Sequence, residues 1–400
     1  MQVLHLISNR DNSGGSIAAK NLHEALLKEK YHSELLSTDQ LAGDKIEPGY
    51  RRFGGITGRI QQAFLKLESM LSLPGQINPI DKWLMQKELK GFNGVLHIHV
   101  THVAQISFDL INWLAEGNKV FWTLHDLWPL TGKCIHPTYC QKWLQLCNNC
   151  PKCEEYPLLK RDSTPFLHRK KNEFINRNKV HFISPSYWID KLAKNHIMLY
   201  GGNLSTIPHS INTEIFKYQD KQLSRSQLSL NLRGLFILFP QGRWDDKKKG
   251  TDWYFQIKDA LTLADKTSKK INLVRIYGEE LQIKEINPFL TEISLPKTNA
   301  KNIMASYYQI ADVSVSVSEV ETFGMCVAES LACKVPVIAR RANGITELLA
   351  DDPTILADHI EDMIQLIILE KWKDFDYTKF FNKNYTNLEW ARKHIELYEA

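Results

Sequence analysis

The 400-residue sequence lacks several features that would assign it to whole classes of protein. No apolar run reaches the roughly 20 residues of a membrane-spanning helix, so we expect no transmembrane segment. The first ten residues have no basic region before their short apolar run, which indicates a first β-strand and not a secretory signal peptide. The formal net charge is only +5, which does not favour nucleic acid as a partner. We therefore expect a cytoplasmic protein.

Cysteine is scarce outside one short segment. Five of the seven cysteines lie between Cys134 and Cys153, and the other two, Cys326 and Cys333, lie on one predicted helix. Because the start of the chain shows no secretory signal, we do not expect a framework of disulfide bonds.

The clustered cysteines predict a structural zinc site. Cys147 and Cys150 have the C-x-x-C spacing of zinc ligands, and Cys134 and Cys140 would complete a set of four thiolates. Such a closed site would hold the Cys-rich loop, residues 132–157, together and would not catalyse. Free thiols and a redox pair are the alternatives. The spare candidate ligands are Cys153 and His136.

The glycines after the first strand do not form the dinucleotide-binding pattern G-x-G-x-x-G, so the sequence gives no support to NAD binding. Instead, Gly14 and Gly15 stand between a short apolar run, residues 3–7, and a helical pattern. A glycine turn between a strand and a helix lets a ligand approach the backbone closely.

The overall composition is that of a soluble globular protein, with 43% hydrophobic and 24% charged residues. Strands alternate with helical patterns in both halves of the chain, which predicts two doubly wound α/β domains. The predicted strands lie at residues 3–7, 95–100, 119–123, 180–183, 234–240, 272–277, 311–318 and 335–339.

One stretch of the second half passes from a strand through a tight turn into a helix. The turn runs from Glu321 to Gly324, and a helix start supplies free backbone N–H groups that suit an anion. Glu329 lies about two turns further on, roughly 12 Å along the helix axis. Carboxylates accept hydrogen bonds from hydroxyls, so the layout suits a ligand with phosphates and hydroxyls, such as a nucleotide sugar.

This stretch resembles the two-glutamate motif of family-4 retaining glycosyltransferases. The resemblance rests on Glu321-x-Phe323-Gly324 and Glu329, followed by Pro336-Val-Ile-Ala339, Gly344 and Glu347. It implies a GT-B fold, with two Rossmann-like domains facing across a cleft. It also implies that Glu321 and the N–H groups near Phe323 and Gly324 hold the donor sugar, and that Glu329 holds the ribose. The chain departs from the family where Lys334 replaces a glycine and Asn343 replaces the first glycine of a pair.

The same resemblance extends to a basic segment after the strand at 234–240. Arg243 and the pair Lys249-Gly250 resemble the family's Arg and Lys-Gly, which grip the donor diphosphate. Fixed cations stabilise a leaving diphosphate on which negative charge develops. The family's spacing is one residue shorter, so the choice among lysines 247–249 stays open. Asp245 and Asp246 stand among these lysines and are not interpreted as a metal-binding pair.

In the first half, Thr123-x-His125-Asp126 resembles the family's Thr-x-His-Asp, which implies that His125 lies near the reacting sugar. Gly15 resembles the glycine loop near the donor phosphates and the acceptor. His97 and His99 share one face of a strand, with His102 just beyond it, and could bind metal, but histidines held by hydrogen bonds are favoured. The Cys-rich loop resembles an insertion of the colanic-acid type of exopolysaccharide enzymes.

A helical pattern at residues 59–73 carries one apolar face. We predict that this face packs on the domain core, and the alternative is a peripheral membrane contact. Basic residues would favour the membrane alternative, whereas Glu68 opposes it. The apolar residues are Ile60, Ala63, Phe64, Leu67, Met70 and Leu71. The basic residues are Arg51, Arg52, Arg59 and Lys66.

The sequence thus predicts three parts: an acceptor-side domain at residues 1–208, a nucleotide-sugar-binding domain at 209–375, and terminal helices at 376–400 that pack back on the first domain. The resemblance implies retaining transfer of a sugar from a UDP or GDP sugar to a hydroxyl of a lipid-linked saccharide. This reaction would serve bacterial surface or exopolysaccharide synthesis at the inner face of the cell membrane, without a catalytic cofactor. The alternatives are a sugar-nucleotide epimerase on the same fold and a non-catalytic partner of another transferase.

Overall fold

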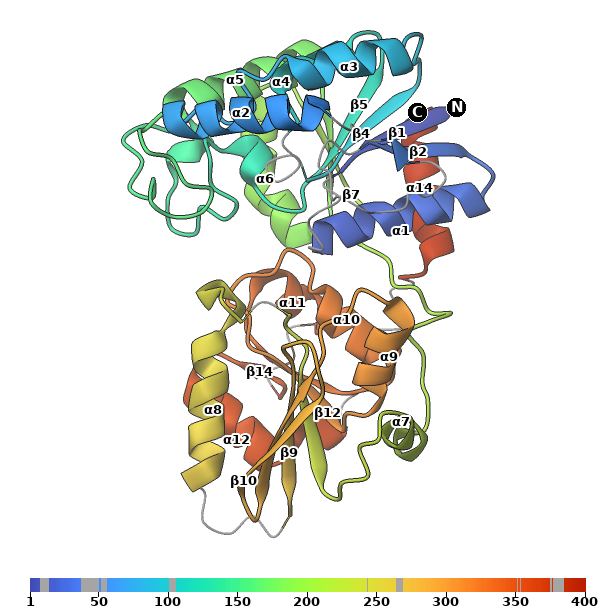
Figure 1. The fold of residues 1–400 in the computed structure, drawn as a ribbon, viewed down its shortest axis with the longest axis vertical. Helices are drawn as coiled ribbons and strands as arrows, with labels where there is room; N and C mark the ends of the chain where they lie inside the picture. Colours follow the sequence, from blue (N-terminus) through green and yellow to red (C-terminus); the bar gives the residue numbers. More distant parts are fainter. Residues whose placement is uncertain are drawn as a thin grey trace. The chain divides into compact units, whose positions relative to one another are not determined.

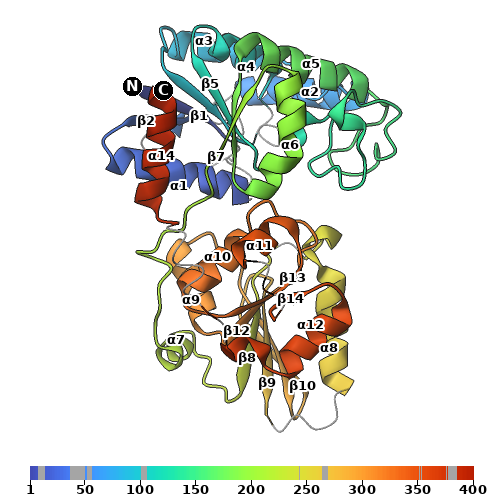
Figure 2. The same cartoon turned by 180° about the vertical axis from the view of Figure 1, so that it is seen from behind.

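The computed structural model describes residues 1–7, 14–36, 50–51, 56–100, 106–242, 244–263, 269–350, 352, 354–374, 376 and 385–400. The chain forms two compact units, of which the first contains Met1–Pro208 and Asn387–Ala400 and the second contains His209–Thr386. The second unit therefore extends beyond residue 375, and the last helix belongs to the first unit. Within the described residues, each unit holds one seven-stranded sheet with helices on both faces (Figures 1 and 2).

The sheet of the first unit is parallel throughout. Its strands lie in the order β3 (Tyr50–Arg51), β2 (His32–Leu36), β1 (Gln2–Leu6), β4 (Val95–Ile98), β5 (Lys119–Thr123), β6 (His181–Ser184) and β7 (Asn203–Thr206). The strand order reverses between β1 and β4, which is the switch point of a doubly wound sheet. The strands read as apolar runs because helices cover both faces.

The helices of the first unit begin and end at local signals. Ser107 and Ser186 accept hydrogen bonds from the backbone N–H groups of Leu110 and Ile189, and each caps the helix that follows it. The helices are α1 (Gly14–Lys28), α2 (Ile56–Leu71), α3 (Ile80–Glu88), α4 (Phe108–Ala115), α5 (Thr164–Asn178), α6 (Tyr187–Leu199) and α14 (Asn387–Glu399). Two 3-10 turns are η1 (Trp128–Leu130) and η2 (Lys142–Leu144).

Helix α14 completes the core of the first unit. Its Tyr398 is fully buried, and Lys119 of β5 donates a hydrogen bond to the Tyr398 carbonyl oxygen at 3.1 Å. Tyr31 also donates an exposed hydrogen bond to the Glu399 carboxylate at 2.7 Å. Residues of β1 and α1 share one buried cluster with residues of α14, so both ends of this unit's sequence meet in one core.

The sheet of the second unit repeats the order of six strands of the first, from β3 to β6, and differs at its two edges, where one strand is added and the counterpart of β7 is absent among the described residues. The strands lie in the order β10 (Gln282–Asn287), β11 (Leu290–Leu295), β9 (Ile271–Ile276), β8 (Leu235–Phe239), β12 (Val313–Ser316), β13 (Val337–Arg340) and β14 (Leu356–Ala357). Only β10 is antiparallel to its neighbour among these strands of the described residues. The strand order reverses between β8 and β12.

The second unit places its helices between these strands. They are α7 (Lys221–Gln227), α8 (Thr251–Leu263), α9 (Lys301–Gln309), α10 (Met325–Ala332), α11 (Asn343–Leu348) and α12 (Ile360–Ile368). The 3-10 turns are η3 (Lys247–Lys249) and η4 (Lys371–Asp374). None of the helices formed by the described residues has the length and apolar character needed to span a bilayer.

Helix α2 corrects one sequence prediction, because its apolar face does not pack on the domain core. Leu67 is 40% exposed, Met70 is 62% exposed and Leu71 is 44% exposed. Glu68 instead is buried, and its carboxylate accepts hydrogen bonds from the backbone N–H groups of residues 75, 77 and 78. Three amide donors therefore hold the acid inward and leave apolar side chains in solvent. Ile60 and Ala63 are exposed as well.

Candidate functional site

The switch point of the second unit gathers the residues that the sequence predicts for donor binding. Open α/β sheets bind ligands at the carboxyl ends of their strands, where the strand order reverses. Here the segment after β8 passes through η3 to Gly250, and the segment after β12 passes through Glu321 to Gly324. Both segments therefore lie at the carboxyl ends of the two central strands, β8 and β12.

A close crossing of these two segments depends on Gly250. Its φ is +77°, and an added Cβ atom would collide with the backbone oxygen of Val317. One residue before Gly250 in the chain is Lys249, and two residues after Val317 the N–H of Glu319 donates to the Lys248 carbonyl at 2.9 Å. The crossing thereby places the Lys249 side chain next to the turn that follows β12.

Lys249 forms an ion pair with Glu321, with 2.7 Å between Nζ and Oε1. Burial alone would lower the pKa of Lys249, but the charge of the Glu321 carboxylate and its hydrogen bond raise the pKa above the usual value. Lys249 is therefore a fixed cation at neutral pH. This geometry favours Lys249 among the three lysines that the sequence left open.

Asp246, which lies before Lys249 in the chain, holds the η3 turn together through hydrogen bonds. The Asp246 carboxylate accepts a hydrogen bond from the N–H of Lys248 at 3.0 Å, and its carbonyl accepts one from the N–H of Lys249 at 2.9 Å. Asp246 thus shapes the η3 turn. Arg243 lies outside the described residues, as does the side chain of Lys247.

Helix α10 begins without a side-chain cap. Its N-cap residue is Gly324, with φ +98°, and a Cβ atom there would lie 2.9 Å from Cγ1 of Ile345. The first N–H groups of a helix have no partner within the helix and carry partial positive charge. The N–H of Gly344 donates to the Glu321 carbonyl at 3.0 Å and holds the turn in place. The result is a helix start that can accept an anion beside Lys249.

The two departures from the glycine pattern keep the backbone that glycine would adopt. Lys334 has φ +55° and Asn343 has φ +34°, so both lie in the left-handed region. Lys334 follows the C-cap of α10, where the N–H of Val335 donates back to the Ser330 carbonyl at 3.0 Å. The fold therefore tolerates these replacements at a cost in backbone strain.

Glu329 lies on α10, which begins at this turn, and its carboxylate is half-buried. Tyr308 of α9, which is fully buried, donates a hydrogen bond to Oε2 of Glu329 at 2.7 Å. Burial raises the pKa of Glu329 to about 7, although the Tyr308 hydrogen bond and the charge of Lys301 lower it. Among the described residues, Oε1 has no hydrogen-bond partner, so it is available to a ligand.

Phe323 has its side chain in the core of the second unit. It is 3% exposed and packs edge-on against the rings of His209 and Tyr385, with centroids 5.5 and 5.6 Å away. Its ring therefore anchors the turn, and only its backbone could contact a ligand. The sequence did not single out Tyr308, because no spacing rule connects a helical tyrosine with a carboxylate 21 residues later.

The first unit places Gly15 against His125. A Cβ atom at Gly15 would lie 2.8 Å from Cγ of His125 and 2.7 Å from Cγ2 of Val100. The glycine is therefore required for the close approach of the α1 start to the histidine ring. Asp126 accepts a hydrogen bond from the N–H of Trp128 at 2.8 Å and shapes the turn after β5.

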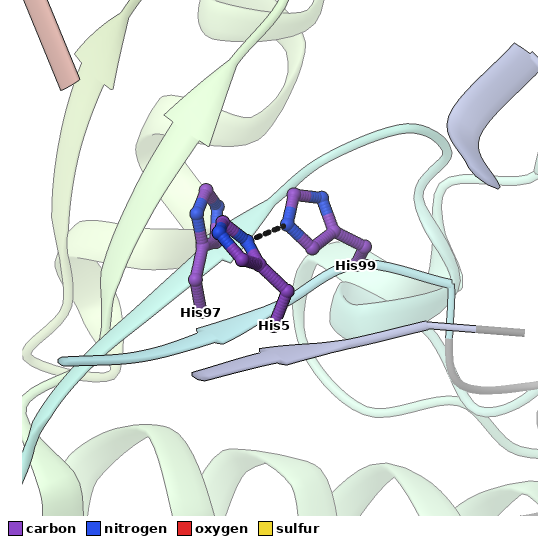
Figure 3. Close-up of side chains that lie close together, drawn as sticks. All are labelled: His5, His97 and His99. Carbon is purple, nitrogen blue, oxygen red and sulfur yellow. Dashed lines mark hydrogen bonds between the residues drawn. The ribbon is translucent and has the colours of Figure 1, made fainter. Parts of the chain in front are cut away.

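His125 is one end of a chain of histidines at the switch point of the first unit. Its Nε2 lies 2.9 Å from Nδ1 of His99. Nε2 of His99 in turn lies 3.0 Å from Nδ1 of His5 (Figure 3). Burial, with the charges of neighbouring histidines, lowers the pKa of His5 and His99 well below the usual value, so both are neutral. A neutral ring donates once and accepts once. The two bonds of His99 therefore run in one direction, so the tautomers of His5, His99 and His125 are coupled.

His97 lies beside this chain and has a different set of partners. Its two ring nitrogens contact the hydroxyls of Tyr398 at 2.5 Å and Thr123 at 2.7 Å. Ligand atoms of His5, His97 and His99 lie within 4.8 Å of one another, which is a spacing that a metal ion could use. Both nitrogens of His97 and of His99 are already hydrogen-bonded, so the geometry favours a hydrogen-bond network. His102 lies outside the described residues.

The cysteine segment forms a pocket of its own in the first unit. Its lining includes all four predicted zinc ligands, Cys134, Cys140, Cys147 and Cys150, but not Cys153. Their sulfur atoms do not include three within 4.8 Å of one another, as far as the described residues show. Burial raises the pKa of Cys134 and raises that of Cys147 to about 11, the opposite of a reactive redox thiol.

Solved structures with the same fold extend over the whole chain. The sucrose-phosphate synthase of Thermosynechococcus elongatus is 16% identical, with a TM-score of 0.69, and the match covers 100% of this chain and 98% of that one. Anabaena HepE, in complex with UDP and glucose, is 14% identical, with a TM-score of 0.63 and 99% of both chains covered. Together with the two mostly parallel sheets, these matches define the fold class as GT-B.

Sequence comparison narrows the class for the second unit. Residues 255–369 match the family model described as "Glycosyl transferases group 1". A protein of Escherichia coli K12 named as a colanic acid biosynthesis glycosyl transferase, WcaC, is 24% identical over 290 residues, which cover 68% of this chain and 66% of that protein. The D-inositol 3-phosphate glycosyltransferase 2 of Catenulispora acidiphila is 24% identical, with 42% of this chain and 43% of that protein covered. The chain thus aligns with less than two thirds of the length of each of these relatives.

Proposed function

We propose that this protein is a glycosyltransferase that moves a sugar from a nucleotide sugar to a hydroxyl of a saccharide. The carrying observation is the 2.7 Å ion pair of Lys249 and Glu321 beside the uncapped start of α10. A fixed cation and free helix N–H groups suit a diphosphate, and a carboxylate suits sugar hydroxyls. The match of residues 255–369 to the group 1 family supports this proposal.

The candidate site residues of the second unit have different roles in this proposal. Lys249 and the α10 N–H groups bind the diphosphate and stabilise the charge that develops as it leaves. Glu321 contacts the donor sugar and orients Lys249. Glu329 accepts hydrogen bonds from the ribose through Oε1, while Tyr308 holds Oε2. Arg243 is proposed as a second cation for the diphosphate.

We propose that the reaction retains the anomeric configuration of the sugar and that the leaving phosphate takes the acceptor's proton. This pathway needs no separate catalytic base, and no cofactor takes part. His125 of the first unit and its neighbour Gly15 would contribute to the reacting face. The donor would be a UDP or GDP sugar, and the Anabaena neighbour solved with UDP and glucose makes UDP sugars the first to test.

The acceptor in this proposal is a lipid-linked saccharide of bacterial surface or exopolysaccharide synthesis, as the name of the E. coli relative suggests. The exposed apolar face of α2 supports a peripheral membrane contact, because Met70 and Leu71 point to solvent while Glu68 is turned inward. The exposed residue Arg161 is tied to the end of α2, because its backbone N–H donates to Ser72 Oγ at 2.9 Å. A basic residue joined to the end of this helix is compatible with contact to an anionic membrane surface.

The membrane contact is tested with vesicles that contain anionic lipid. The double variant Met70→Glu, Leu71→Glu should lose vesicle binding in a flotation assay, whereas Leu263→Glu should not. Leu263 is a matched control because it is 83% exposed but lies on α8 of the second unit. Equal binding of all three proteins would exclude α2 as the contact.

The transfer reaction is tested by release of nucleoside diphosphate from UDP and GDP sugars, with and without a lipid-linked saccharide acceptor. The proposal expects release that depends on the acceptor and a product with the donor's anomeric configuration, as read by NMR. Conversion of the donor sugar without any acceptor would indicate an epimerase. A product of inverted configuration would overturn the retaining mechanism.

A further inference from the structure

The cysteine pocket of the first unit carries an inference that is independent of sugar transfer. Four cysteines from a span of 17 residues, Cys134 to Cys150, line one pocket. Every cysteine of the chain is a free thiol in this structure, so no disulfide explains why they gather there. Cysteines that only fill a core have no reason to share one pocket with two buried lysines.

The backbone around Cys147 and Cys150 is held in a defined turn. Asn149 between them has φ +43°, and Lys142 donates hydrogen bonds to the carbonyl oxygens of Asn148 and Asn149 at 3.1 and 2.9 Å. The N–H of Gly132 donates to Sγ of Cys147 at 3.2 Å. An amide donor to sulfur favours the thiolate, which is the form that binds a metal ion, but without an ion, burial outweighs it and keeps Cys147 a thiol.

The turn is also fixed from outside. The N–H of Cys147 donates to Nδ1 of His168 at 2.9 Å, and the N–H of Cys150 donates to the Asp162 carboxylate at 2.8 Å. These bonds use the backbone N–H groups of the two cysteines, so they do not occupy the thiols of these pocket-lining residues.

The buried lysines that line the pocket lack a close negative charge among the described residues. Lys133 and Lys152 line the pocket and are only 2% and 7% exposed. The ammonium of Lys133 is held by the carbonyls of residues 152, 153 and 155, and no carboxylate of the described residues lies within 4.0 Å of it. Lys152 pairs only at 3.6 Å with Glu155, which is 46% exposed. Buried lysines are rarely left without an opposite charge.

From the shared pocket, the amide-to-sulfur bond and the buried lysines, we propose that Cys134, Cys140, Cys147 and Cys150 bind one structural Zn²⁺ ion. Binding releases four protons from the thiols to solvent, and the ion with four thiolates carries a net charge of about −2. Lys133 and Lys152 supply the two positive charges that balance it. A tetrahedral site with Zn–S bonds of about 2.3 Å requires the four sulfur atoms to draw inward around the ion.

The test begins with zinc content of the full-length protein, purified without a metal-binding tag and compared with two variants. The native protein and Cys153→Ser should hold about one zinc ion per chain, because Cys153 lies outside the pocket lining. The double variant Cys147→Ser, Cys150→Ser should hold at least about tenfold less. Zinc retained by the double variant would overturn this ligand set.

Measurements on the native protein keep the test decisive if the double variant does not fold. Exchange of the zinc for Co²⁺ should give the intense visible absorption of a tetrahedral thiolate site, and a chelator should abolish it. Thiol titration of the unfolded, chelated protein should find all seven cysteines reduced. A zinc-free native protein, or a protein with fewer reduced thiols because of disulfides, would overturn the proposal.

Discussion

The two units share the order of six sheet strands but equip the switch point with opposite chemistry. In the second unit the switch point carries charges: Lys249 pairs with Glu321 at 2.7 Å, and Glu329 lies nearby on α10. In the first unit it carries neutral rings, because burial lowers the pKa of His5 and His99. The comparison indicates that the strand order sets the position of the candidate site in each sheet, whereas the loops after the strands set the chemistry of that site. A charged donor belongs to the second unit on this account, and the first unit contributes orientation and not charge.

The largest effect should come from removing the cation of the charged switch point. Lys249→Met should lower turnover by about 10²–10³-fold, because one preorganised group that stabilises leaving-group charge has this effect. The matched control is Lys248→Met, which removes the same charge from the neighbouring position. If steady-state kinetics showed the same loss of turnover in both variants, the pairing of Lys249 with Glu321 would not matter for catalysis.

A smaller effect should follow at the neutral switch point. Gly15→Ala places a Cβ atom 2.8 Å from Cγ of His125 and must displace that ring. Turnover should fall by about tenfold to a hundredfold, since a misplacement of about 1 Å has that cost. Nucleotide binding by the second unit, measured by calorimetry, should stay unchanged. A parallel loss of nucleotide binding would contradict the division of labour between the two units.

Tyr308→Phe should sharpen the account of Glu329. The hydroxyl of Tyr308 lowers the pKa of Glu329, which burial raises to about 7, so its removal should raise this pKa further. If the ionised carboxylate holds the ribose, donor affinity rises with pH through the pKa, and the variant's midpoint moves to higher pH. Affinity at pH 7 should fall by about tenfold, because the variant loses one hydrogen bond to a charged group. Donor titrations across pH 6 to about 8.5 measure the midpoint, and an unmoved midpoint would exclude Tyr308 as the positioning residue.

The smallest effect should be one of stability. Lys334 has φ +55°, and a left-handed backbone costs a non-glycine residue about 1 kcal/mol. Lys334→Gly should therefore raise the free energy of unfolding of the second unit by up to about 1 kcal/mol, less the entropy that glycine adds to the unfolded chain. Chemical denaturation measures the change, and donor affinity should not move. A destabilised variant would mean that contacts of the lysine outweigh the strain.

Much of this architecture could be predicted from the sequence, and the limits have physical causes. Alternation of apolar runs with helical patterns predicted two doubly wound units, because strands covered on both faces leave a clear apolar signal. The antiparallel strand β10 was missed, since its exposed, charged residues carry no such signal. The exposed face of α2 was predicted wrongly, because the apolar pattern cannot tell a core from a solvent face. What decides the matter is Glu68, whose three amide partners exist only in the folded chain.

The sequence could predict those site residues that lie close together in the chain. It could not predict contacts between residues that are far apart in the sequence and close only in the folded structure. Glu321, Gly324 and Glu329 lie within nine residues, so a motif could indicate them. The choice of Lys249 among its neighbours needed the crossing at Gly250, which no spacing rule contains. The histidine chain joins residues 94 positions apart, His5 and His99, and only the sheet register brings them together.

The central claim is that the charged switch point of the second unit is the donor site, and calorimetric titration with UDP and GDP tests it most directly. The account predicts that one nucleotide binds the native protein, that Glu329→Ala loses this binding, and that Glu361→Ala keeps it. Glu361 is an exposed acid in the first turn of α12 and serves as the matched control. Undiminished binding by Glu329→Ala, or no binding of either nucleotide to the native protein, would contradict the claim.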